Sequence, residues 1–149
     1  MADYDFITYD ELDDGRIARI MLDRDEARNA QNRGMLVELN EAFLRAEADD
    51  EVRVVIFGGN GSMFTSGHDM GSKVSMSEVA EHPSWQVNGG TRSGAERLML
   101  QEWHHFFDNT RRWRNLRKIT IAKVHGTVYA AGLMLARACE LIVAADDVV

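Results

Sequence analysis

The chain has 149 residues, 45% of them hydrophobic, which is enough for one domain with a sizeable core. A net charge of −7 argues against a dedicated nucleic-acid binder, which would usually be basic. Since no apolar stretch reaches the ~18 residues needed to cross a bilayer and the acidic N-terminus lacks a signal-peptide pattern, we expect a cytoplasmic protein without membrane contact.

The first elements predicted along the chain are two strands joined by a tight turn. Residues 13–15, Asp-Asp-Gly, separate two strand-like runs, which is a typical hairpin signal. Apolar residues then recur at helical spacing between positions 33 and 49, and this predicts an amphipathic helix. A β-branched run ended by glycines, residues 52–59, predicts a buried strand. Strand, helix and strand in this order predict a parallel βαβ unit.

Residues 71–94 interrupt this pattern with a long polar stretch, which we interpret as an insertion or a mobile loop. The pattern of residues 95–117 predicts one long helix. Its expected apolar face consists of Met99, Trp103, Phe106, Thr110 and Trp113. Residues 119–125 and 141–145 predict two more buried strands, with a helix at 133–139 between them. Because no closing helix follows the last strand, we expect the chain to be the front part of a larger α/β domain.

Two turns rich in small residues follow predicted strands. They are GGNGSMFTSGHDM, residues 58–70, and HGTVYAAGLM, residues 125–134. In α/β sheets, ligands gather where strands end and helices begin. Two such turns could direct two backbone N–H groups at one oxygen, an arrangement that suits a carbonyl becoming an oxyanion or an enolate.

At these residues the sequence resembles the crotonase (enoyl-CoA hydratase/isomerase) superfamily. RIARIMLDRDEARNAQN (16–32) is similar to the early strand and adenine-side loop of the family, and VRVVIFGGNGSMFTSGHDM (52–70) to its first oxyanion turn. KVHGTVYAAGLMLARACELIVAADD (123–147) is similar to the second oxyanion turn with its helix and following strand. The resemblance implies a crotonase-like α/β fold, a superhelix of ββα units. Residues 1–149 would be the N-terminal part of one such domain, cut off after that last strand.

The resemblance also implies a site. The backbone N–H groups of His68 and Ala131 would form an oxyanion hole for the thioester carbonyl of an acyl-CoA. Further substrate contacts are implied for Ala27, Arg28, Ser66, Asp69, Met70 and Gly132. No metal and no separate cofactor are implied, because coenzyme A is part of the substrate. Relatives form trimers or pairs of trimers, so a homo-oligomer is expected.

Several alternatives stay open at the sequence level. Met134 stands where hydratases of this family place a glutamate, and a thioether cannot transfer a proton, so the hydration mechanism is unsupported. The chain could instead be an inactive acyl-CoA binder, or a truncated protein that serves only as an interaction module. The side chain of His68 could carry a proton, and Asp69 could be an acid rather than a carboxylate that bonds loop N–H groups. His104 and His105 are adjacent on a helix, point to different sides and are not expected to share a metal.

Overall fold

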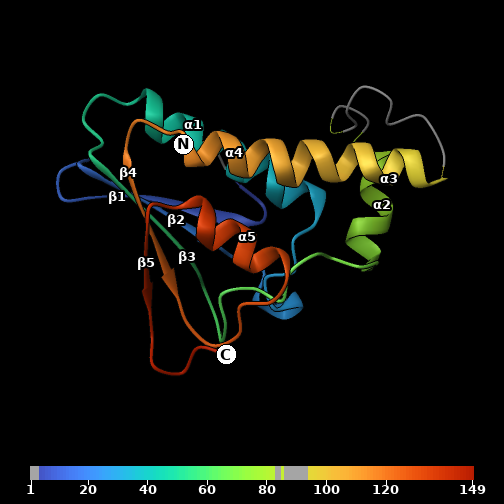
Figure 1. Cartoon of the computed structure of the whole chain (residues 1–149). Coiled ribbons are helices and arrows are strands. Elements are labelled where there is room, and N and C mark those ends of the chain that lie inside the picture. Colours follow the sequence, from blue (N-terminus) through green and yellow to red (C-terminus); the bar gives the residue numbers. More distant parts are fainter. Residues whose placement is uncertain (1–3, 83–84, 86–93) are drawn as a thin grey trace.

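The computed structural model describes residues 4–82, 85 and 94–149, which form a sheet with helices packed against it (Figure 1). Five strands lie side by side in chain order. They are β1 (Ile7–Leu12), β2 (Ile17–Leu22), β3 (Val54–Gly59), β4 (Ile119–Val124) and β5 (Leu141–Ala144). The helical elements are η1 (Asp25–Ala27), α1 (Arg33–Ala48), α2 (Lys73–Glu81), α3 (Gly94–Glu102), η3 (Trp103–Asp108), α4 (Asn109–Arg114) and α5 (Ala131–Ala138).

The predicted hairpin is confirmed. Strands β1 and β2 pair antiparallel, from Ile7 opposite Leu22 to Leu12 opposite Ile17. All three turn residues have positive φ, 53° at Asp13 and Asp14 and 84° at Gly15. Aspartate and glycine tolerate this left-handed region better than other residues, which explains why this tripeptide makes the turn.

The predicted parallel βαβ unit is also confirmed. Strand β2 leads through α1 to β3, which pairs parallel to it, and β4 and β5 continue the sheet in the same direction. The carboxyl ends of β3 and β4 therefore lie at the same edge, so the two turns singled out in the sequence leave the sheet side by side. The fold class, α/β, is as expected.

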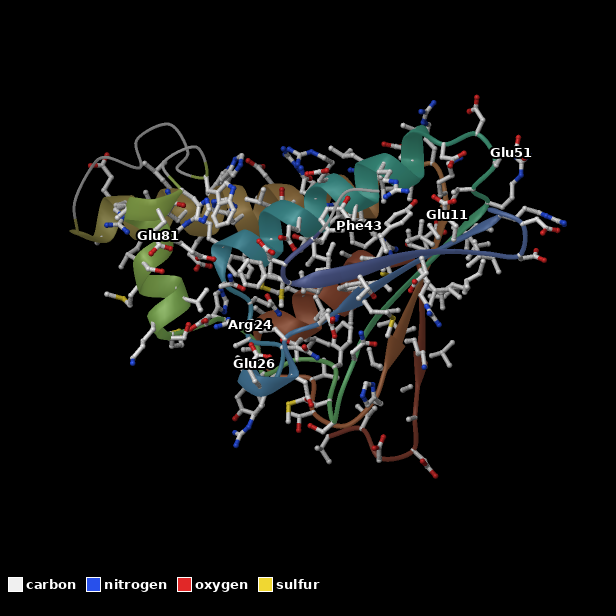
Figure 2. The ribbon with its side chains drawn as sticks, turned by 180° about the vertical axis from the view of Figure 1, so that it is seen from behind. Glu11, Arg24, Glu26, Phe43, Glu51 and Glu81 are labelled. Atoms are coloured by element: carbon white, nitrogen blue, oxygen red, sulfur yellow. The ribbon has the colours of Figure 1, made fainter. Side chains whose placement is uncertain are left out.

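One face of the sheet carries the core. Ile20, Phe57 and Ala122 lie in register on three neighbouring strands and are fully buried. Phe43 of α1 covers them, with its ring edge-on to Phe57 at 5.4 Å and stacked on Trp113 of α4 at 4.9 Å (Figure 2). Helix α4 in turn contacts α5, so three helices form a layer over this face.

The prediction that β5 is a buried strand is wrong. Leu141, Ile142 and Val143 are 55%, 47% and 59% exposed. The strand lies at the edge of the sheet and pairs only with β4. Its apolar sequence matches that of a covered parallel strand, but within the described residues both of its faces remain open.

The predicted long helix is confirmed in extent, since α3, η3 and α4 run on as one rod from residue 94 to 114 (Figure 1). Its predicted apolar face is partly wrong. Met99 and Trp103 are 63% and 56% exposed, whereas Phe106 and Trp113 are buried as expected. The segment η3 is a π-helix, which has more residues per turn than an α-helix and so rotates the preceding residues out of the expected stripe.

The segment 71–94 is partly regular. Residues 73–81 form α2, whose Glu78 is 2% exposed and accepts hydrogen bonds from the backbone N–H groups of Arg33 and Gly34 at the start of α1. This part is therefore a helix docked on the core rather than an irregular loop. Residues 83–84 and 86–93 lie outside the described residues, and mobility of the segment stays a prediction.

Candidate functional site

The first turn, which follows β3, is held by one side chain from the loop after β2. Asn29 is fully buried, and its Oδ1 accepts a hydrogen bond from the backbone N–H of Arg24 at 2.8 Å. Its Nδ2 donates to three carbonyls of the turn, those of Asn60 (2.8 Å), Met63 (3.1 Å) and Phe64 (3.1 Å). The sequence placed Asn29 in a substrate loop, but nothing in the pattern indicated this structural role.

Backbone hydrogen bonds join the first turn to the second. The amide of Thr65 donates to the carbonyl of Thr127 at 3.3 Å, and the amide of Tyr129 donates to the carbonyl of Thr65 at 3.2 Å. Gly132 allows this approach, because a Cβ there would lie 2.6 Å from the Thr65 methyl carbon. The structure thus gives Gly132 a packing contact between the two turns.

Gly67 is a second point of close approach between the turns. Its φ is +90°, and a Cβ there would lie 2.9 Å from the carbonyl oxygen of Tyr129 and 3.5 Å from the amide nitrogen of Ala131. The Gly67 amide donates to Thr65 Oγ1 at 3.1 Å. The next amide, that of His68, and the amide of Ala131 have no hydrogen-bond acceptor among the described residues. Since Ala131 is only 1% exposed, water does not readily satisfy its amide, and buried unpaired N–H groups are rare.

The backbone before Ala131 is unusual. Ala130 has φ 44° and ψ −109°, a region that non-glycine residues rarely occupy, at a cost of ~1–3 kcal/mol. This conformation places Ala131 as the first residue of α5, where helical N–H groups have no partner within the helix. Such local strain often accompanies a functional site.

A cavity of about 660 Å³ lies between the first turn and the long helix. It is lined by Gln31, Arg33, Leu36, His68, Asp69, Met70, Gly71, Ser75, Met76, Arg97, Leu98, Gln101, Glu102, His105 and Phe106. In its lining the His68 Nε2 lies 3.1 Å from Glu102 Oε2, and the imidazole packs on the Phe106 ring with 4.1 Å between centroids. The cavity therefore places an imidazole–carboxylate pair beside the first unpaired amide.

The carboxylate of Asp69 serves the loop. It lies 2.6 Å from Arg24 Nη1 and accepts backbone hydrogen bonds from Gly71 and Ser72 at 3.2 and 2.8 Å. Burial alone would raise the pKa of Asp69, but the hydrogen bonds from Ser72 and Arg24 hold it below its usual range. The interpretation of Asp69 as a carboxylate that bonds loop N–H groups is confirmed.

The remaining predicted contact residues lie around the first turn. Ala27 ends η1, and the carbonyl of Arg28 accepts a hydrogen bond from the amide of Ser66 at 3.0 Å, so the loop after β2 runs beside the turn. Met70 is 92% exposed at the rim of the cavity. The structure thus brings Arg28 beside Ser66, while Met70 lines the cavity with His68. Their contact with a substrate stays a prediction.

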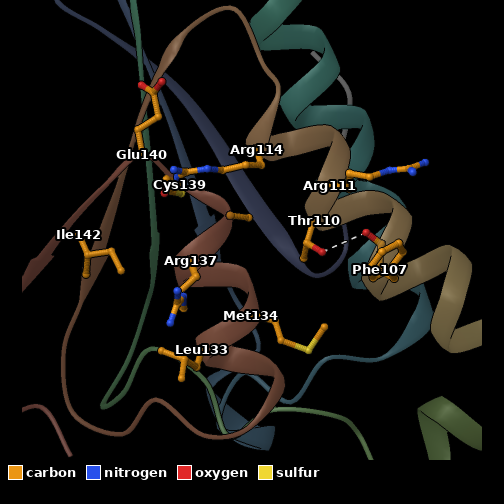
Figure 3. A pocket seen from close by; sticks show the side chains of 11 residues that line it. Phe107, Thr110, Arg111, Arg114, Leu133, Met134, Arg137, Cys139, Glu140 and Ile142 are labelled. Atoms are coloured by element: carbon orange, nitrogen blue, oxygen red, sulfur yellow. Dashed lines mark hydrogen bonds between the residues drawn. The ribbon is translucent and has the colours of Figure 1, made fainter.

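A second cavity, of about 830 Å³, opens between α5 and the long helix (Figure 3). Met134 of α5 points toward Thr110 and Phe107 there. The cavity also contains Cys139, a buried thiol whose pKa is raised by burial to about 12, so it stays protonated at neutral pH. Met134 and His68 thus line different cavities.

No three His, Cys, Asp or Glu side chains converge as metal ligands in residues 4–82, 85 and 94–149. The rings of His104 and His105 are nearly perpendicular, and His105 Nε2 lies 3.2 Å from the carbonyl oxygen of Trp85. Across the same described ranges, no helix is both long and apolar enough to span a bilayer.

Comparison with known proteins places this geometry in a family. The chain matches the enoyl-CoA hydratase/isomerase family over residues 13–149. It is 57% identical to EchA13 of Mycobacterium tuberculosis over 99% of this chain and 48% of that protein. It is 29% identical to 4-chlorobenzoyl coenzyme A dehalogenase-2 of an Arthrobacter species, over 87% of this chain and 42% of that protein. The chain therefore belongs to the enoyl-CoA hydratase/isomerase, or crotonase, family.

Solved structures support the same family assignment. An enoyl-CoA hydratase/isomerase from Xanthobacter autotrophicus Py2 superposes with a TM-score of 0.75 at 34% identity, over 98% of this chain and 48% of that one. The resemblance read from the two turns is confirmed, as is the crotonase-like fold. The chain spans about half the length of the relatives it matches.

Proposed function

We propose that the site binds an acyl-CoA thioester and that the amides of His68 and Ala131 donate hydrogen bonds to its carbonyl oxygen. The observation that supports this most is a pair of unpaired amides in adjoining turns, one of them in a residue only 1% exposed. Preorganised donors in a site shielded from water contribute ~3 kcal/mol each to stabilising a developing oxyanion.

The chemistry that fits such donors is enolate formation. When a base removes the proton next to the thioester carbonyl, the electron pair moves onto the carbonyl oxygen, where the two amides stabilise it. We propose His68 and Glu102 as the proton-transfer pair, because they lie 3.1 Å apart in the lining of the cavity and the first of these amides is that of His68 itself. Met134 lines the other cavity and has no proton to exchange.

Exchange of the α-protons tests the enolate directly, because it needs no hydration step. Butyryl-CoA is incubated with the purified protein in D2O, and loss of the α-proton signal is followed by NMR. We expect enzyme-dependent exchange, slowed ~100-fold in Glu102→Gln. The matched control is Glu51→Gln, which removes an exposed carboxylate near the sheet's far edge (Figure 2). Equal exchange rates for both variants would rule out the proposed role of Glu102.

The second candidate is an acyl-CoA binder without catalysis, which Met134 at the family's glutamate position favours. Calorimetric titration with butyryl-CoA and with free coenzyme A separates the two. Tight binding of butyryl-CoA without α-proton exchange would establish the binder. Absence of binding would refute the proposed site. The hypothesis that the chain serves only as an interaction module would then remain. A homo-oligomer stays a prediction, which analytical ultracentrifugation tests.

A further inference from the structure

The cavity beside His68 contains a group of buried polar atoms that have no hydrogen-bond partner in the described structure. Three are donors, namely Arg33 Nη1, Arg97 Nε and Gln101 Nε2, and one is an acceptor, Gln31 Oε1. Gln101 and Gln31 are only 7% and 3% exposed. An unpaired buried polar group costs ~1–3 kcal/mol, so three such donors on side chains that line one cavity favour a ligand that satisfies them.

The arrangement of these donors is fixed by neighbouring contacts. Arg33 Nε donates to Gln101 Oε1 at 3.1 Å, which leaves the amide nitrogen of Gln101 free. Burial lowers the pKa of Arg33 most, the nearby Glu78 carboxylate opposes this, and the positive charge of Arg97 lowers it further. Both guanidinium groups remain charged in proteins. Two like charges and an amide donor thus belong to side chains that line the same cavity.

The two carboxylates that line the cavity are paired with groups other than these arginines. Asp69 is bonded to Arg24, at 2.6 Å, and Glu102 to His68, at 3.1 Å. A bound carboxylate would satisfy the unpaired donors and reduce the repulsion between the two arginines. Charge-assisted hydrogen bonds to a carboxylate are about twice as strong as neutral ones, and arginine suits that planar group well.

Building on the proposed function, we propose that the acyl group of the substrate ends in a carboxylate bound by Arg33, Arg97 and Gln101. The thioester would lie at His68, the carboxylate at these three side chains, and both groups line the same cavity. The substrate class is then the CoA monothioester of a short dicarboxylic acid. Arg28, on the loop that the family resemblance assigns to coenzyme A, lies outside this lining.

Matched ligands test this by calorimetry on the purified protein. Succinyl-, glutaryl- and adipyl-CoA are compared with butyryl-, pentanoyl- and hexanoyl-CoA, so that each pair differs only in the terminal carboxylate. We expect one dicarboxylic thioester to bind at least ~10-fold more tightly than its partner. Arg97→Met and Gln101→Glu should abolish that preference and change the affinity for the uncharged partner less than ~2-fold. Gln101→Glu supplies a built-in carboxylate beside Arg33 and keeps the shape of the side chain.

Arg117→Met is the control, because Arg117 is an exposed arginine paired with Glu47 away from the cavity. It should preserve the preference. Equal affinity for every matched pair would overturn this inference while leaving the proposed function intact. Equal weakening of both ligands in Arg97→Met would mean that Arg97 binds the phosphates of coenzyme A, and would also overturn it. If neither ligand series binds, the proposed function itself fails.

Discussion

Replacing Gly67 by alanine should test the contact that holds the two turns together. Gly67 has φ +90°, and its new Cβ would lie 2.9 Å from the Tyr129 carbonyl oxygen, closer than real Cβ atoms come. Gly15 offers a matched control, because its φ is +84° and a Cβ there would meet nothing within 4 Å. Both substitutions therefore carry a similar backbone strain, and only Gly67→Ala adds a steric contact.

The magnitudes follow from these two contributions. Placing an L-residue in the left-handed region costs ~1–2 kcal/mol, so Gly15→Ala should lower the free energy of unfolding by about 1 kcal/mol. The contact with Tyr129 involves a backbone oxygen, which cannot rotate away as a side chain would. Overpacking of this kind costs ~1–3 kcal/mol, so Gly67→Ala should lose about 2–4 kcal/mol in total.

Urea unfolding followed by circular dichroism measures both losses, and acyl-CoA affinity provides a second readout. Since the new Cβ would lie 3.5 Å from the Ala131 amide nitrogen, Gly67→Ala should also weaken butyryl-CoA binding, whereas Gly15→Ala should not. Equal destabilisation by the two substitutions would refute the steric argument. Unchanged binding in Gly67→Ala would refute the assignment of this junction to the thioester.

Three further substitutions test other parts of the structure. Ala130→Gly should raise the free energy of unfolding by about 1 kcal/mol in urea, because glycine accepts φ 44° without strain; a loss would show that Ala130 is unstrained. Glu78→Gln should lower it by ~2 kcal/mol, because the carboxylate bonds two amides at the start of α1; a neutral result in thermal unfolding would contradict that role. Burial, aided by His104, lowers the pKa of His105 to about 4. An unfolded histidine, with a pKa near 6.5, therefore takes up its proton first, and stability should fall by about 3 kcal/mol between pH 6.5 and 4. His105→Gln should flatten this slope, and an unchanged slope would show that another group causes it.

The sequence predicted those parts of the fold that local patterns determine. The hairpin at residues 13–15 depends on turn chemistry, and the βαβ unit on strand and helix periodicity, so both could be derived. The environment of β5 could not, because its apolar sequence is the same whether or not another element covers it. The apolar face of the long helix could not be derived from periodicity, because the π-helical turn η3 shifts the register between α3 and α4.

The site also divides into features that the sequence indicates and features that depend on distant partners. Small residues marked the two turns, and the resemblance to the crotonase family implied the amides of His68 and Ala131 as donors, a role that stays a prediction. The burial of polar residues along the long helix was not predicted. Gln101, His105, Asn109 and Trp113 recur every four residues on its inner side, and three of them are polar. A hydrophobic pattern cannot identify such a stripe, because its partners at the start of α1 are distant in sequence.

The two ends of the cavity differ in what determines their chemistry. At the thioester end, the proposed donors are backbone amides positioned by Gly67 and by the conformation of Ala130. Backbone amides stay in place under side-chain substitutions that preserve the fold, so the proposed donors would accept the carbonyl of any thioester. At the far end, the donors belong to the side chains of Arg33, Arg97 and Gln101, which single substitutions can exchange. The backbone would therefore set the reaction type, while these three side chains would select the acyl group.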